Sequence, residues 1–146
     1  MNWQNPIVED HKLFLVFKNI GLQILQQLKV TLTGELYSNY FKDTVVTEKN
    51  ELLFTYLDHN FKTQLEVFFN HSKMPQFAFI ATYYLRPEKF KDPLEIVSYA
   101  FDLNYNINKI YTLQDFAEYY IIEFHQNLKK SFSDEHTPFP IRMNGK

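Results

Sequence analysis

The first regular hydrophobic pattern begins after Asn5-Pro6, a pair that suits a helix start because asparagine caps and proline is favoured at the first helical position. Apolar residues then recur at spacings of three and four, which is the period of one helix face, at Leu13, Phe14, Phe17, Ile20, Ile24, Leu25, Leu28 and Leu32. We expect an amphipathic helix of about 25 residues that ends near Thr33-Gly34, where glycine suits the left-handed stop.

Two further features of this helix bear on its surroundings. Gly21 lies on the expected buried face, where glycine costs about 1 kcal/mol relative to alanine. Either another backbone, that of the sheet, approaches the helix closely at Gly21, or nothing in the structure requires glycine there. Val8, Leu15 and Leu22 are seven residues apart and face away from the main stripe, where a surface helix should be polar. This second row suggests that the helix is covered on two sides.

The middle of the chain alternates in a way that is typical of strands. Residues 35–50 are ambiguous, although the β-branched run Thr44–Thr47 favours extended structure. An antiparallel meander is then predicted, with Asp58-His59-Asn60 among its turns. Its strands are Leu52–Leu57, Gln64–Asn70, Gln76–Leu85 and Glu95–Leu103, with a short extra strand at Ile107–Tyr111 left open.

Alternation within these strands predicts which residues share a face. We expect the row of Phe77, Phe79, Ala81, Tyr83 and Leu85 to be core, together with the rows that contain Leu65 and Val97. The opposite face is mixed but more apolar than a solvated face normally is. Phe68, Ile80 and Tyr84 are the apolar residues that we expect there.

The last element is a second amphipathic helix. Thr112–Asp115 resembles a capping box, with Asp in place of Glu or Gln, and one apolar face then runs through Phe116, Tyr120, Phe124 and Leu128. We expect this helix to end near Phe132. The pattern thus predicts an α+β fold: an N-terminal helix, an antiparallel meander of four to five strands and a C-terminal helix, with both helices packed on one sheet face. Residues 1–132 form the single domain, and residues 133–146 an extended tail that contains Phe139 and Ile141.

Composition narrows the function classes. The chain has no cysteine, which removes disulfides, thiolate metal sites and thiol nucleophiles. Its 13 lysines outnumber 2 arginines, its net charge is −2 and it has no basic stripe, so we expect no nucleic-acid partner. The start lacks the pattern of a signal peptide, and no apolar run is long enough to span a membrane. We expect a cytoplasmic protein with no membrane partner.

Residues that could carry chemistry form no recognisable constellation. The five histidines, among them His59, His71 and His125, show no metal-ligand spacing. With three glycines the chain could hardly build a phosphate cradle, and no nucleophile has an evident base. We therefore expect no cofactor and no metal, and we regard an enzyme as the less favoured class.

The leading hypothesis is a non-catalytic interaction module, either a homodimer or a small accessory or inhibitory subunit of a larger complex. The expected partner-binding residues are those left over after the core is assigned: Val8, Leu15, Leu22, Phe68, Ile80, Tyr84, Phe139 and Ile141. The alternative is a binder of a small apolar ligand in a cavity between sheet and helices, lined by Phe68, Phe79, Tyr84 or Tyr99.

Overall fold

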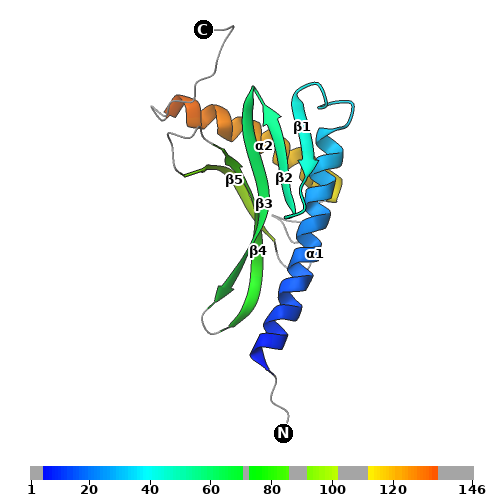
Figure 1. Ribbon diagram of the computed structural model, residues 1–146. Helices are drawn as coiled ribbons and strands as arrows, with labels where there is room; N and C mark the ends of the chain where they lie inside the picture. Colours follow the sequence, from blue (N-terminus) through cyan, green and yellow to red (C-terminus); the bar gives the residue numbers. More distant parts are fainter. Residues whose placement is uncertain (1–4, 71–72, 86–91, 102–111, 135–146) are drawn as a thin grey trace.

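The computed structural model describes residues 5–70, 73–85, 92–101 and 112–134. Along the chain, one helix precedes an antiparallel meander and a second helix follows it, which confirms the α+β class (Figure 1). The first helix, α1, spans Pro6–Leu32, and the last, α2, spans Leu113–Asp134. Between them lies a five-stranded sheet in the order β1-β2-β3-β4-β5. The strands are β1 (Phe41–Val46), β2 (Glu51–Tyr56), β3 (His59–Asn70), β4 (Lys73–Tyr84) and β5 (Leu94–Phe101).

Both helices start at the residues that the capping signals predict. The Asn5 side chain accepts a hydrogen bond from the Ile7 amide at 2.9 Å, and Pro6 is the first helical residue. At α2 the Thr112 hydroxyl accepts from the Asp115 amide at 3.0 Å. These bonds satisfy amide donors that the first turn of a helix leaves without a partner.

The four predicted strands from Leu52 to Leu103 are confirmed in existence and differ at their ends, while the possible extra strand at Ile107–Tyr111 lies outside the described residues. β3 begins at His59, five residues earlier than predicted, because the turn is tighter than the sequence suggests. Leu57 and Asp58 adopt left-handed φ angles of 51° and 64°, and Tyr56 then pairs directly with His59. Two consecutive left-handed residues are what a two-residue hairpin turn of type I′ requires. The ambiguous region before Thr44 supplies turns and the start of β1.

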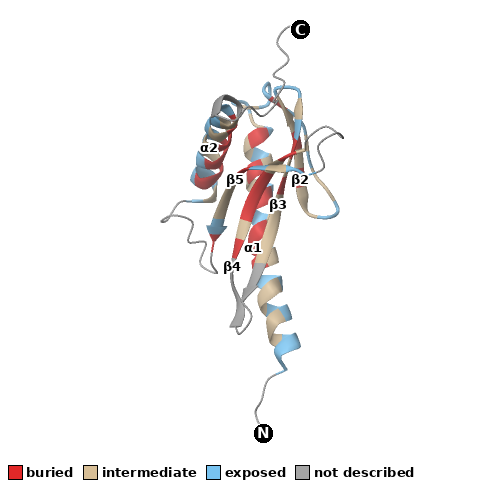
Figure 2. Ribbon diagram, turned by 90° about the vertical axis from the view of Figure 1, so that its left-hand side faces the viewer, coloured by how far each residue is buried: buried red, intermediate tan, exposed pale blue. Residues whose placement is uncertain are grey.

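Both helices lie on the same face of the sheet, as predicted. The α1 residue Phe17 packs against Phe101 of β5, while the α2 residue Phe124 packs against Phe54 and Phe61. The buried residues concentrate where the two helices face the strands (Figure 2). The first turns of α1 are mostly exposed and extend past the buried part of the sheet (Figures 1 and 2).

The predicted core row of β4 is wrong. Ile80 and Tyr84 are only 0% and 3% exposed, and their row, not that of Phe79 and Tyr83, faces the helices. Register explains the error: Leu65 pairs with Ile80 and Phe61 with Tyr84, so these residues share the covered face. The sequence favours the row of Phe79 and Tyr83 as core because its side chains are larger. The helices instead approach the row whose other members, Ala78 and Thr82, are small.

Gly21 is constrained by the sheet, as the first of the two interpretations holds, but the predicted close approach of a backbone is wrong. A Cβ at this position would lie 2.8 Å and 2.9 Å from the two Cδ atoms of Leu65 on β3. The close neighbour is therefore a side chain of the sheet and not its backbone. Glycine allows α1 to settle closely on β3.

Candidate interaction surface

The outer row of α1 remains uncovered by the described part of the chain. Val8 and Leu15 are 46% and 47% exposed, and Leu22 is partly buried. Because residues seven apart drift by only about 20° around a helix, the three side chains form one line about 21 Å long. The core stripe of α1, which includes Ile24 and Leu28, lies on the opposite side. A second apolar row on a surface helix is unusual, since that side of such a helix is normally polar.

Positive charge accompanies this row. Lys12 and Lys18 are three residues before and after Leu15, which puts them about 60° to either side of it. Lys29 takes the next heptad position after Leu22. The carboxylates of α1, Glu9 and Asp10, lie in its first turns and more than about 100° around the helix from Leu15. From His11 to Gly34 the sequence contains no Asp or Glu.

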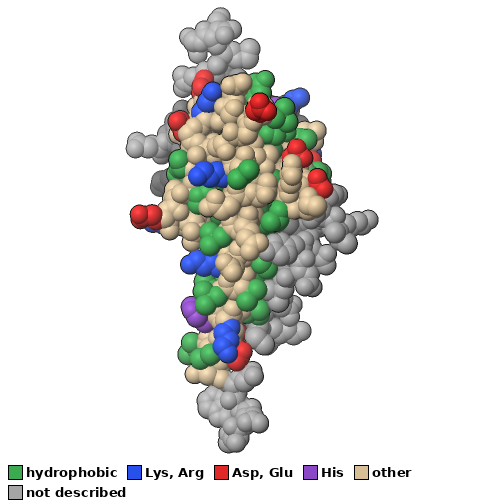
Figure 3. Space-filling model, turned by 90° about the vertical axis from the view of Figure 1, so that its right-hand side faces the viewer, with side chains coloured by type: hydrophobic (Ala, Val, Ile, Leu, Met, Phe, Trp, Pro, Cys, Tyr) green, Lys and Arg blue, Asp and Glu red, His purple; other side chains and the backbone are tan. Residues whose placement is uncertain are grey.

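The exposed Lys12 forms an ion pair within α1. Its ammonium lies 3.8 Å from the Glu9 carboxylate, and its side chain is 69% exposed. An exposed pair of this kind contributes at most about 1 kcal/mol and is easily exchanged for a better partner. Figure 3 looks onto α1 and shows hydrophobic and basic side chains interspersed along it.

A hollow continues this row towards α2. It has a volume of about 330 Å³ and is lined by Leu22 and Val30 of α1, by Leu113 at the start of α2, and by the amide side chains Asn19, Gln23, Gln26 and Gln27. Leu22 therefore belongs to both the row and the hollow. Together they form one apolar track with amides and lysines beside it, which we call the α1 outer face: Val8, Lys12, Leu15, Lys18, Leu22, Lys29, Val30 and Leu113.

No protein family, curated protein or solved structure matches this chain.

The other sequence-predicted contact residues do not join this face. Ile80 and Tyr84 lie in the core, as described above, and Tyr84 is bonded through its hydroxyl to Nδ1 of His59 at 3.1 Å. Phe68 pairs with Phe77 in the β3–β4 register, and its side chain lies outside the described residues. Phe139 and Ile141 of the predicted tail also lie outside them.

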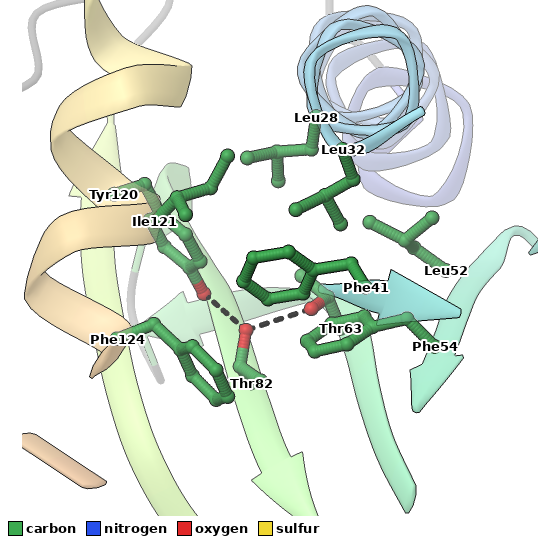
Figure 4. A pocket seen from close by; sticks show the side chains of 10 residues that line it. All are labelled: Leu28, Leu32, Phe41, Leu52, Phe54, Thr63, Thr82, Tyr120, Ile121 and Phe124. Atoms are coloured by element: carbon green, nitrogen blue, oxygen red, sulfur yellow. Dashed lines mark hydrogen bonds between the residues drawn. The ribbon is translucent and has the colours of Figure 1, made fainter. Parts of the chain in front are cut away.

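Where Leu28 and Leu32 of α1 and Tyr120 of α2 face the sheet, the described side chains leave only a small cavity. The cavity there measures about 10 Å³, at the threshold for a single water molecule (Figure 4). Its polar side chains bond to one another: the Thr82 hydroxyl lies 2.7 Å from that of Thr63 and 2.7 Å from that of Tyr120. Burial raises the pKa of Tyr120, so its phenol stays neutral and can donate or accept the hydrogen bond with Thr82. This cavity has no room for a ligand.

A second hollow, which the sequence reasoning missed, opens at the β1 end of the sheet. It has a volume of about 230 Å³ and combines three distant segments: Tyr37, Tyr40 and Phe41; Tyr56; and Ile121, Ile122, His125 and Gln126. The Tyr56 hydroxyl lies 2.6 Å from Nδ1 of His125, and burial raises the pKa of Tyr56. The phenol is neutral at physiological pH, and its hydrogen bond holds the His125 imidazole in place. The aromatic density around residues 37–41 was the available signal.

The described residues contain neither a cluster suited to a metal ion nor a membrane-spanning helix. No three histidine, aspartate or glutamate side chains of that part of the chain gather closely enough to hold a metal ion. None of its helices is both long and apolar enough to cross a bilayer.

Proposed function

We propose that this protein is a non-catalytic interaction module that binds a protein partner through the α1 outer face. The observation that carries the proposal is the exposure of Val8 and Leu15 on a helix whose core stripe is already satisfied on the opposite side. Exposed apolar rows with a polar rim are typical of protein interfaces. An accessory subunit of a larger complex fits this arrangement.

The proposal is tested by quantitative affinity capture from cells that express the protein. The variant Val8→Ser/Leu15→Ser removes two exposed apolar side chains without touching the core. The matched control, Val45→Ser/Leu57→Ser, removes two side chains of similar exposure (47% and 48%) elsewhere on the surface. We expect a stoichiometric partner that the control retains and the α1 variant loses. Equal recovery with both variants contradicts the proposal.

Self-association is distinguished by light scattering of the purified protein at micromolar concentration. A dimer that the Val8→Ser/Leu15→Ser variant dissociates identifies a second copy as the partner. If the purified protein is a monomer, the partner is the different protein recovered by affinity capture.

A second candidate function, binding of a small apolar ligand, is favoured by the hollow at Tyr56 and His125. Its walls are aromatic or aliphatic and its few polar atoms converge, as in ligand sites, although about 230 Å³ is below their usual range of roughly 300–1,000 Å³. Native mass spectrometry of the purified protein should show a bound mass that an Ile122→Glu variant loses. Ile122 is exposed and lines the hollow, so this variant should keep its fold.

A further inference from the structure

We infer that the partner of the α1 outer face is an acidic amphipathic helix, and this inference rests on the proposed function. The shape of the surface supports a helix. Val8, Leu15 and Leu22 form a straight row at heptad spacing, which is the spacing at which a second helix can lie alongside. A helix face offers no free backbone donors or acceptors of its own. A segment that docks here must satisfy its own backbone hydrogen bonds, as a helix does and a single extended strand does not.

Charge complementarity supports an acidic partner. Lys12 and Lys18 flank Leu15 on both sides. The carboxylates of α1 are confined to its first turns, where that of Glu9 lies 3.8 Å from the Lys12 ammonium, and none follows Asp10 along the helix. Glutamate or aspartate side chains at the edges of a docking helix would meet these lysines, in the way that flanking charges select partners in coiled coils.

The same charges disfavour a second copy as the occupant. Two α1 outer faces brought together about Leu15 would place Lys12 and Lys18 of each copy opposite those of the other. Like charges facing each other in an interface cost binding energy. The row alone is also short, since three apolar side chains fall well below the roughly 1,200 Å² that stable interfaces bury. The partner must therefore add contacts beyond the row, and the hollow at Leu22 and Leu113 is the adjacent place for them.

Two synthetic helical peptides of about three heptads serve as probes, both with leucine at the inner positions. One carries glutamate at the flanking positions and the other carries lysine. We expect the glutamate peptide to bind at least about 10-fold more tightly than the lysine peptide at low salt, and the difference to shrink as salt rises, because exposed charges are screened. Equal affinity, the opposite preference or no binding of either peptide overturns the inference.

Two sets of variants localise the effect, after circular dichroism confirms their fold. Lys12→Glu/Lys18→Glu should reverse the preference between the peptides. The control Lys42→Glu/Lys49→Glu makes the same charge change on and beside β1 and should leave the preference intact. Leu15→Ser should weaken binding of the glutamate peptide by about 10-fold, because it removes an apolar anchor from the interface. A preference that survives Lys12→Glu/Lys18→Glu contradicts the inference.

The outcomes separate this inference from the function on which it rests. If the captured partner depends on Val8 and Leu15 but tolerates Lys12→Glu/Lys18→Glu, the interaction function stands and the acidic partner is rejected. A lipid surface is tested with vesicles of phosphatidylcholine and phosphatidylglycerol. Binding to these vesicles without binding to the glutamate peptide also rejects the acidic helix.

Discussion

At the scale of residues, stability depends on buried polar groups that a hydropathy pattern does not distinguish from their neighbours. Thr82 lies between Thr63 and Tyr120 in a hydroxyl chain beneath α2, and all three side chains are buried. Sequence alternation places Thr82 on the same face as Ile80 but cannot indicate that its hydroxyl has partners on two other elements. Such pairings depend on tertiary register.

Replacing Thr82 by valine keeps the shape of the side chain and removes the middle hydroxyl. We expect a loss of about 1–3 kcal/mol in the free energy of unfolding, because the hydroxyls of Thr63 and Tyr120 lose their shared partner in the core. Tyr120→Phe should cost less, since Thr82 then keeps its bond to Thr63. Urea titrations of both variants measure the difference, and the opposite order would contradict the hydroxyl chain.

The contact between Gly21 and Leu65 predicts the effect of a second substitution. Gly21→Ala gains about 1 kcal/mol of helix propensity but puts a methyl group less than 3 Å from both Cδ atoms of Leu65. Overpacking of this kind costs about 1–3 kcal/mol, so we expect net destabilisation of about 1 kcal/mol. Leu65→Ala should remove the penalty of the alanine in a double-mutant cycle. Additive effects of the two changes would show that contact with Leu65 is not the reason why alanine destabilises the protein at position 21.

At the scale of elements, the sequence predicts what depends on periodicity and fails where register decides. Each helix and strand is predicted from the spacing of apolar residues within its own stretch of sequence, so the existence and order of the described elements are predicted correctly. Which face of β4 is covered depends on its alignment with β3, and a shift of one residue exchanges the two faces. This is why Ile80 and Tyr84 were assigned to the wrong surface. The hollow at Tyr56 and His125 combines three distant segments, so no single periodic pattern could indicate it.

The two faces of α1 should respond differently to substitution. Val8→Ser/Leu15→Ser should change the free energy of unfolding by less than about 0.5 kcal/mol per site, as is usual for exposed positions. Ile24→Ala on the covered face should cost about 2–5 kcal/mol. Thermal or urea unfolding compares them. A large loss in the serine variant would mean that the outer row supports the fold itself.

At the scale of the whole molecule, one buried and two partly buried tyrosines predict the response to alkaline pH. Burial, as the largest cause, raises the pKa values of Tyr83, Tyr99 and Tyr120 above their ordinary value of 10.0. A group whose pKa is raised by folding contributes its stability fully below the unfolded value and loses it as pH rises beyond that value. The contribution of these tyrosines to stability should therefore be constant below about pH 10 and fall above it.

Urea midpoints measured between about pH 8 and pH 12 test this dependence, and Tyr120→Phe provides the control. The variant should reduce the alkaline slope by up to about 1.4 kcal/mol per pH unit, the contribution of one tyrosine proton. An unchanged slope would show that Tyr120 ionises as readily in the folded protein as in the unfolded chain.

The central claim is that the α1 outer face binds a protein, and photo-cross-linking in intact cells tests it most directly. A photoreactive phenylalanine analogue is placed at Leu15 or, as a control of nearly equal exposure, at Leu57. We expect one discrete cross-linked product from position 15 that is missing from position 57 and is lost when Lys12→Glu/Lys18→Glu is added. Absence of any product specific to position 15 would contradict the account.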